Sequence, residues 1–182
     1  MAMAITVPRY TVADLEDFPD DGNRYELLDG ILLVTPLASA PHQRISTRLL
    51  VMLSRGLLSE KHAVICTPGA ISIPDFIHLE PDLLVVPGKY SINTPWTEMT
   101  EHWLAVEVIS RSSRKYDRDF KRDAYIKLGV REVWLIDFRD KSIEVCRKVG
   151  EGEVVRDGFN WQVPELNITV KIDLGVLFEG LP

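Results

Sequence analysis

The run Trp103-Leu104-Ala105-Val106-Glu107-Val108-Ile109 is the most apolar strand-like stretch of this chain, and it carries a single carboxylate. Apolar residues occupy both of its alternating positions, which is typical of a strand covered on both faces in a central sheet. An unpaired carboxylate would be costly there, so Glu107 needs a metal ion, a cationic partner or a raised pKa.

A second acid, Asp82, precedes a similar apolar run, Leu83-Leu84-Val85-Val86. Basic side chains follow Glu107: positions 111–122 hold six of them and two acids, a net charge of +4. Two acids on neighbouring buried strands, followed by a basic helix, favour a metal-dependent phosphodiesterase site, because hard cations prefer carboxylate ligands. A solvated helix face would carry the same charges, so the basic segment alone leaves both interpretations open.

Length and composition indicate one ordinary globular domain. The chain has 182 residues, of which 46% are hydrophobic and 26% charged. No apolar stretch approaches the roughly 20 residues that span a bilayer, and the N-terminus lacks a signal-peptide pattern. We therefore expect a cytoplasmic protein without a membrane segment, in which Cys66 and Cys146 are reduced thiols. The net charge of −6 argues against indiscriminate binding to nucleic acid.

The order of predicted elements indicates an α/β sandwich around a mixed sheet. A hairpin turns at Asp29-Gly30, and helices are expected from Pro41 to about Leu58 and over about 113–128. The predicted strands are 63–73, 82–86, 103–109, 132–137, 142–147, 153–156 and 168–173.

The second helix separates its side chains into two neighbouring faces. Asp117, Lys121 and Tyr125 recur every four residues and therefore share one face. Phe120 and Ala124 lie on a more apolar face, which we expect to pack on the sheet. Lys121 would then project from the border of the core toward the strand ends.

A set of short motifs occurs along the chain in a fixed order: Tyr25-Glu26-Leu27-Leu28-Asp29-Gly30, Pro41-His42, Pro81-Asp82, Glu107-Val108-Ile109-Ser110, Tyr116-Asp117-Arg118, Lys121, Tyr125, Gly129-Val130 and Glu132-Val133-Trp134-Leu135-Ile136-Asp137. In this order they resemble the Uma-two family, described as "putative restriction endonucleases", within the PD-(D/E)XK nuclease superfamily. The resemblance implies a restriction-endonuclease-like sandwich in a single domain, 1–182. This fold is a mixed β-sheet flanked by helices, with an α-β-β-β-α-β core over about 10–150, added β-hairpins, and peripheral C-terminal strands at 151–182.

The superfamily implies that Asp82 and Glu107 bind Mg²⁺ or Mn²⁺. A lysine usually lies two residues after the second acid, where this chain has Ile109. Family members are thought to supply it from the next helix, and Lys121 matches that position, with Lys115 as a competing candidate. The family pattern further implies Glu26 and His42 near the metal, supporting roles for Gln43, Ser110, Asp117 and Tyr125, and the basic segment offers phosphate contacts from Arg111, Arg114, Lys115 and Arg118.

The predicted function is a metal-dependent endonuclease that hydrolyses DNA phosphodiester bonds. We expect a homodimer, because a two-fold dimer would present the short basic face twice. An alternative is a non-catalytic nucleic-acid-binding or regulatory module on a degenerate nuclease scaffold, which the acidic net charge and Ile109 favour. A paired-carboxylate glycosidase is a third hypothesis, with Trp96 and Trp161 as exposed aromatic residues.

Purely structural roles compete with each of these assignments. Glu107 would pair with an arginine, and Lys121 would lie on the surface beside Asp117. Glu26 would face solvent from its hairpin strand, and His42 would be exposed near the start of its helix.

Overall fold

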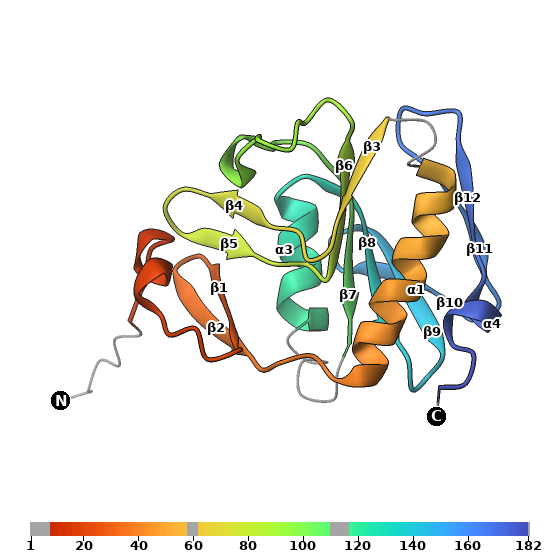
Figure 1. The fold of residues 1–182 in the computed structure, drawn as a ribbon, viewed down its shortest axis with the longest axis horizontal. Coiled ribbons are helices and arrows are strands. Elements are labelled where there is room, and N and C mark those ends of the chain that lie inside the picture. Colours follow the sequence, from red (N-terminus) through yellow and green to blue (C-terminus); the bar gives the residue numbers. More distant parts are fainter. Residues whose placement is uncertain (1–7, 58–61, 110–116, 182) are drawn as a thin grey trace.

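The computed structural model describes residues 8–57, 62–109 and 117–181, and its centre is a mixed six-stranded sheet (Figure 1). The strand order is β10-β9-β8-β7-β6-β3, with β7 and β8 parallel and every other pair antiparallel. The mixed α/β prediction is therefore confirmed. The strands are β3 (Ala63–Cys66), β6 (Leu83–Pro87), β7 (His102–Val108), β8 (Val130–Asp137), β9 (Ser142–Lys148) and β10 (Glu151–Val155).

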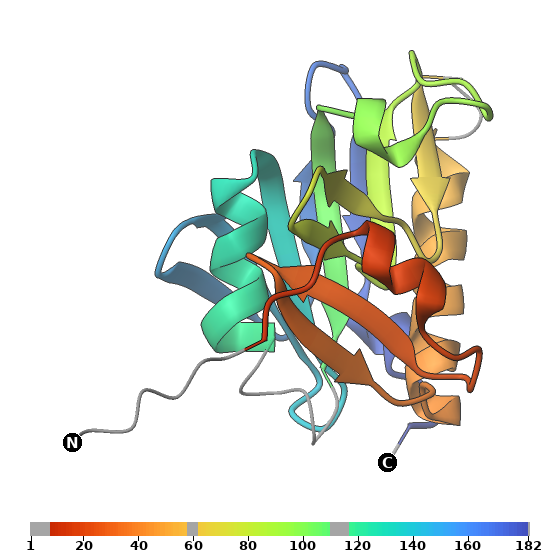
Figure 2. The ribbon, with the colours of Figure 1, turned by 90° about the vertical axis from the view of Figure 1, so that its left-hand side faces the viewer.

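Helices cover the two faces of this sheet, as the double-sided apolar pattern predicted. On one face, Leu104 and Val106 share a core with the helix α1 (Ala40–Leu57). On the other, Ala105 and Ile109 join a core with α3 (Arg122–Lys127), which follows a π-helical turn at Asp117–Lys121. Figure 2 shows the two helices on opposite sides of the strands. Alternation along β7 therefore directs Glu107 to the α3 side.

A second, four-stranded sheet lies against the α3 side in the order β2-β1-β5-β4. Its first two strands form the predicted hairpin, which turns through positive φ angles of 50° at Asp29 and 74° at Gly30. The strands are β1 (Arg24–Leu28), β2 (Ile31–Thr35), β4 (Ile71–Ile73) and β5 (Ile77–Leu79).

The predicted single strand 63–73 is wrong: it divides into β3 and β4, which belong to different sheets. Between them Gly69 approaches β6 so closely that an added Cβ would lie 2.3 Å from the Cβ of Leu84. The chain must cross there without a side chain, and it then returns as β5, a strand that periodicity did not indicate. The expected apolar helix face is also displaced, because Phe120 is 52% exposed whereas Lys121 and Tyr125 are buried.

The C-terminal segment contributes to the core and is more than a peripheral addition. Strands β11 (Phe159–Gln162) and β12 (Thr169–Ile172) form a two-stranded sheet, and α4 spans Leu174–Leu177. Trp161 is 2% exposed and packs edge-to-face on Trp134 with ring centroids 5.5 Å apart. These residues share a core with α1, so they close the α1 side of the central sheet.

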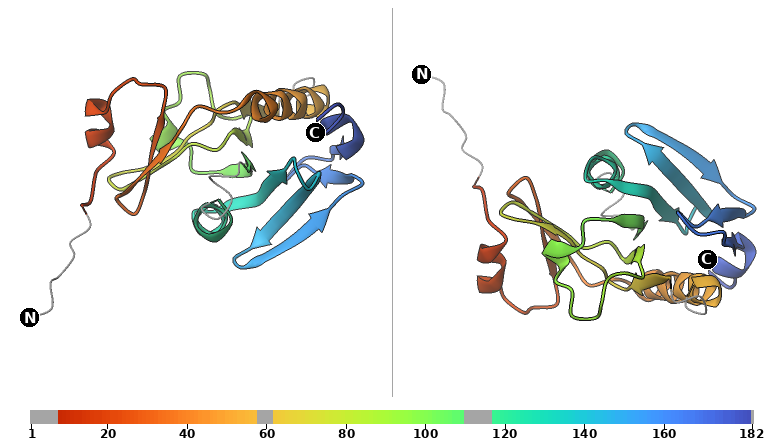
Figure 3. Two further views of the ribbon diagram at one scale, coloured as in Figure 1. Left: turned by 90° about the horizontal axis from the view of Figure 1, so that it is seen from below. Right: turned by 90° about the horizontal axis from the view of Figure 1, so that it is seen from above.

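Of the helices in the described residues, none is long and apolar enough to cross a membrane. The four-stranded sheet and the β9–β10 hairpin lie at opposite ends of the molecule, as Figure 3 shows. Asp82 lies next to His42 near the start of α1, and Glu107 lies next to Lys121 just before α3.

A buried histidine makes fold stability sensitive to mild acid. Burial lowers the pKa of His102 below its ordinary 6.5. The folded chain therefore binds this proton less readily than the unfolded chain, so stability is complete above about pH 6.5 and declines below it. We expect His102→Gln to reduce the fall in the free energy of unfolding below pH 6.5 by up to about 1.4 kcal/mol per pH unit. Urea unfolding between pH 7.5 and 5.5 measures the difference, and His62→Gln, at an exposed position, is the control.

Candidate functional site

Two buried carboxylates from different sheets meet at one buried ammonium group. The Nζ atom of Lys121 donates to Oε2 of Glu26 at 2.7 Å and to Oε1 of Glu107 at 3.1 Å. Glu26, Glu107 and Lys121 are 0%, 3% and 2% exposed. Water cannot screen such contacts, so each charge depends on the others for its stability. The surface role for Lys121 and the solvent-facing role for Glu26 are therefore wrong.

Tyr125, on the same helix, also holds Glu107 in place. Its hydroxyl donates to Oε1 of Glu107 at 2.6 Å, one helical turn beyond Lys121. Burial, together with the charges of Glu107 and Glu26, raises the pKa of Tyr125 well above its usual value, so the phenol remains a donor. Glu107 is thus fixed by two neighbours on the same helix face, and neither is an arginine.

Asp82 lies beside this cluster because of strand register. Leu83 is opposite Val106, so extending the antiparallel pairing by one residue places Asp82 opposite Glu107. The backbone N–H of Val108 donates to Oδ2 of Asp82 at 2.8 Å. That bond fixes the carboxylate at the edge where β6 and β7 meet.

Two basic side chains, Arg24 and His42, contact Asp82 from opposite directions. Nη1 of Arg24 lies 2.9 Å from Oδ1, and Nε2 of His42 lies 2.8 Å from Oδ2. Burial alone would raise the pKa of Asp82, but His42, Arg24 and the Val108 N–H together hold it below the ordinary 3.8. His42 is 6% exposed, so the expectation of an exposed imidazole near the helix start is wrong.

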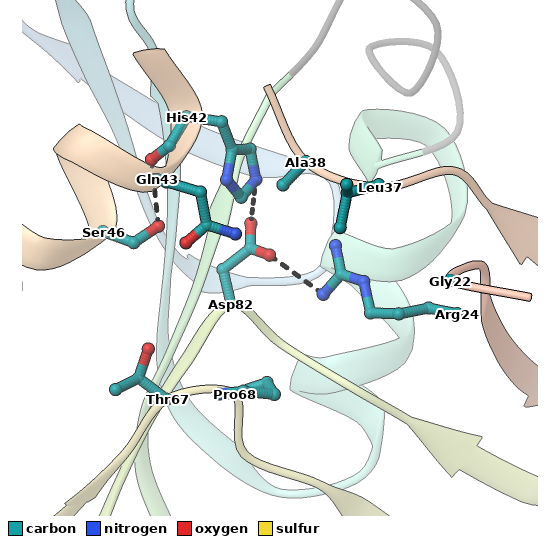
Figure 4. A pocket seen from close by; sticks show the side chains of 10 residues that line it. All are labelled: Gly22, Arg24, Leu37, Ala38, His42, Gln43, Ser46, Thr67, Pro68 and Asp82. Carbon is teal, nitrogen blue, oxygen red and sulfur yellow. Dashed lines mark hydrogen bonds and ion pairs between the residues drawn. The ribbon is translucent and has the colours of Figure 1, made fainter. Parts of the chain in front are cut away.

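A cavity of about 130 Å³ opens onto this side of Asp82. Figure 4 shows Arg24, His42 and Asp82 on its wall, with the side chain of Gln43 directed toward the same opening from α1. The Oγ of Ser46 donates to the backbone carbonyl of His42 at 3.2 Å and supports the first turn of the helix. The cavity gives solvent and small solutes a route to the acid.

The side chains suit a hard divalent cation by donor type. Glu26, Asp82 and Glu107 offer carboxylate oxygens, and Mg²⁺ uses one or two of these while keeping several waters. Over 8–57, 62–109 and 117–181, no three His, Cys, Asp or Glu side chains form a ready-made metal-binding group. Protein cations contact the acids instead, so an ion would have to displace at least one of them.

The helix that carries Lys121 is braced from outside by Glu144 on β9. Nε of Arg118 lies 3.1 Å from its Oε2, and Nη1 of Arg122 lies 3.3 Å from its Oε1. Gly152 on β10 leaves the necessary room, since a Cβ there would lie 2.5 Å from Oε1 of Glu144. Arg118 thus pairs with Glu144 within the protein, and its contact with phosphate stays a prediction.

Sequence reasoning missed Arg24, although the signal was present. Arg24 stands two residues before Glu26, and alternation in a strand directs both to one face. The remaining predicted residues cannot be placed: Ser110, Arg111, Arg114 and Lys115 lie outside the described residues, as does the side chain of Asp117.

The sheets, the flanking helices and the acid–lysine cluster define a restriction-endonuclease-like α/β protein. The chain belongs to the Uma2 (Uma-two) family, whose model, described as "Putative restriction endonuclease", matches residues 12–175. The match extends beyond the expected 10–150 and includes the C-terminal strands that close the core.

A solved structure has the same fold. It is described as "a putative nuclease belonging to DUF820" from Anabaena variabilis, with a TM-score of 0.74 and 18% sequence identity. The superposition covers 92% of this chain and 97% of that one. No curated protein matches the chain significantly.

Removal of the Lys121 charge tests the buried cluster. Lys121→Met would leave Glu26 and Glu107 without their shared cation, and we expect it to lower the free energy of unfolding by about 3–5 kcal/mol. Urea unfolding in the presence of a chelator measures this loss. Lys89→Met is the matched control, because Lys89 pairs with Glu101 at the surface and its loss should change little. Equal effects of the two substitutions would contradict the arrangement.

The brace formed by Glu144 is tested separately. Glu144→Gln removes the charge that both arginines contact. We expect it to lower the free energy of local unfolding of this helix by about 1–3 kcal/mol. Hydrogen exchange of the backbone amides over 117–127 reports that opening. Glu153→Gln, at an exposed position on the next strand, should leave the exchange unchanged. Unaltered exchange in Glu144→Gln would show that the helix does not depend on this contact.

Proposed function

We propose that this protein is a divalent-metal-dependent endonuclease that hydrolyses phosphodiester bonds in DNA. The convergence of Glu26, Glu107 and Lys121 in one buried cluster, with Asp82 beside it, is the observation that carries the proposal. Two acids at adjacent strands and a lysine from the neighbouring helix are groups that can serve metal-assisted phosphoryl transfer. Membership of the Uma2 family supports the same reaction class.

The proposed ligands are Asp82 and Glu107, with Glu26 and His42 beside them, and the ion is Mg²⁺ or Mn²⁺. When bound, such an ion would generate the attacking water and neutralise charge on the phosphate. Hydrolysis forms a bond from the water oxygen to phosphorus and breaks one ester P–O bond. Lys121 would stabilise the additional negative charge, and its buried position makes that stabilisation strong because little water screens it.

Other side chains would hold these groups in place. Tyr125 keeps Glu107 oriented through its 2.6 Å hydrogen bond, and the Val108 N–H does the same for Asp82. Gln43, at the rim of the cavity, is positioned to contact substrate from α1. Each helix or strand at the site thus supplies either a charged side chain or a group that holds such a side chain in position.

DNA is the proposed substrate and a homodimer the proposed assembly. The described basic residues near the site are largely paired with acids, so the surface offers few cations to a duplex. A two-fold dimer would double that small number and place two sites on the two strands.

A non-catalytic nucleic-acid-binding or regulatory module is the second candidate. It is favoured by Ile109 at the usual lysine position and by the internal cations that already balance the acids. In this case the cluster would be a structural remnant that holds the two sheets together.

The proposal is tested by cleavage of duplex DNA with Mn²⁺ or Mg²⁺ and with chelator alone. We expect cleavage only with the ion, and a loss on the order of 100-fold or more in Asp82→Asn and in Glu107→Gln. Titration calorimetry of Mn²⁺ into the same variants separates loss of ion binding from loss of catalysis.

Glu153→Gln is the matched control, since it removes an exposed carboxylate far from the cluster. Binding of DNA without cleavage by well-folded wild type would instead support the non-catalytic module. Light scattering coupled to gel filtration of the same samples tests the dimer, and a monomer at high concentration would exclude it.

A further inference from the structure

We propose that Arg24 is an internal counter-ion that occupies the ion-facing side of Asp82 and must be displaced when a divalent cation binds. The inference rests on the proposed function, because it concerns the same acids. It adds a residue that controls how readily the site accepts its ion.

The contacts of Asp82 show which partner is able to leave. Oδ2 accepts from the backbone N–H of Val108 and faces Nε2 of His42, while Oδ1 faces Nη1 of Arg24. The backbone bond belongs to the strand edge and cannot move without opening the sheet. Among residues 8–57, 62–109 and 117–181, Oδ1 contacts only the side chain of Arg24, and a side chain can change rotamer.

Arg24 is also more accessible than the other basic side chains that contact these acids, His42 and Lys121. Its side chain is 24% exposed, against 8% for His42 and 3% for Lys121. It lines the cavity in Figure 4, so the guanidinium can swing into that space and remain hydrated. Its departure would break the contact with Asp82 and the hydrogen bond from Nη1 to the Glu80 carbonyl, whereas Lys121 would have to leave two buried carboxylates.

Electrostatic repulsion is the reason why a divalent ion would displace Arg24 from Asp82. A divalent ion on Asp82 would repel a guanidinium held against the same carboxylate, since both are cations in a poorly screened site. Glu26 and Glu107 reinforce the attraction for Arg24, which holds its pKa above the ordinary value although burial works in the opposite direction. Arg24 therefore stabilises the ion-free protein and weakens ion binding by the same coupling.

The test is calorimetric titration of Mn²⁺ into wild type, Arg24→Gln and Arg24→Lys, with thermal unfolding in chelator and in Mn²⁺. We expect Arg24→Gln to bind Mn²⁺ about tenfold more tightly than wild type. Its Tm in chelator should be lower than that of wild type, and the rise in Tm on adding Mn²⁺ should be larger. Arg24→Lys keeps the charge and should remain close to wild type.

Arg131→Gln is the matched control. Arg131 contacts Glu101 and Glu165 near the start of β8, whereas Glu107 lies beside Leu135 near the end of that strand, so the substitution should not affect ion binding. Wild type that binds Mn²⁺ while Arg24→Gln binds it equally or less tightly would overturn this inference and leave the proposed function standing. Failure of every variant to bind Mn²⁺, also with a short DNA duplex present, would overturn both.

Discussion

The contact of Lys121 with Glu26 and Glu107 is the constraint on which the rest of the site depends. It joins the two sheets, since Glu26 lies on β1 and Glu107 on β7, and it ties both to the helix segment that carries the lysine. Burial makes each charge costly without the others, so the three elements must assemble together. Glu144 then acts from the opposite side, holding the arginines that flank Lys121.

Contacts with basic side chains explain how these acids can be buried close together. Arg24 and Lys121 contact Asp82, Glu26 and Glu107 at hydrogen-bond distances, and the imidazole of His42 also contacts Asp82. At the proposed ion site, the same side chains that stabilise the fold would compete with a divalent ion for the carboxylates. Fold stability and ion affinity would then be opposed in the same few side chains.

Sequence periodicity predicted the structural features that depend on residues close together in the chain. The double-sided apolar pattern around Glu107 placed it in a covered strand, and Asp29-Gly30 marked the hairpin. The family resemblance implied Glu26 and Lys121 as separate site residues, but their ion pair was not predicted, because 95 residues separate them. Strand β5 was missed because its long-range pairing with β1 is not encoded in sequence spacing. Alternation with Glu26 indicated the face of Arg24, but its contact with Asp82, far along the chain, was not predicted.

The position of the lysine on the helix follows from packing. Ile109 lies two residues after Glu107 and is 2% exposed, in the same apolar cluster as Tyr125. A lysine at 109 would bring a second ammonium into space that these apolar side chains fill, close to the Tyr125 hydroxyl that already donates to Glu107. Lys121, one helical turn before Tyr125, reaches the same carboxylate from the edge of that cluster. A lysine on the helix therefore places a cation at Glu107 and leaves the core around Ile109 apolar.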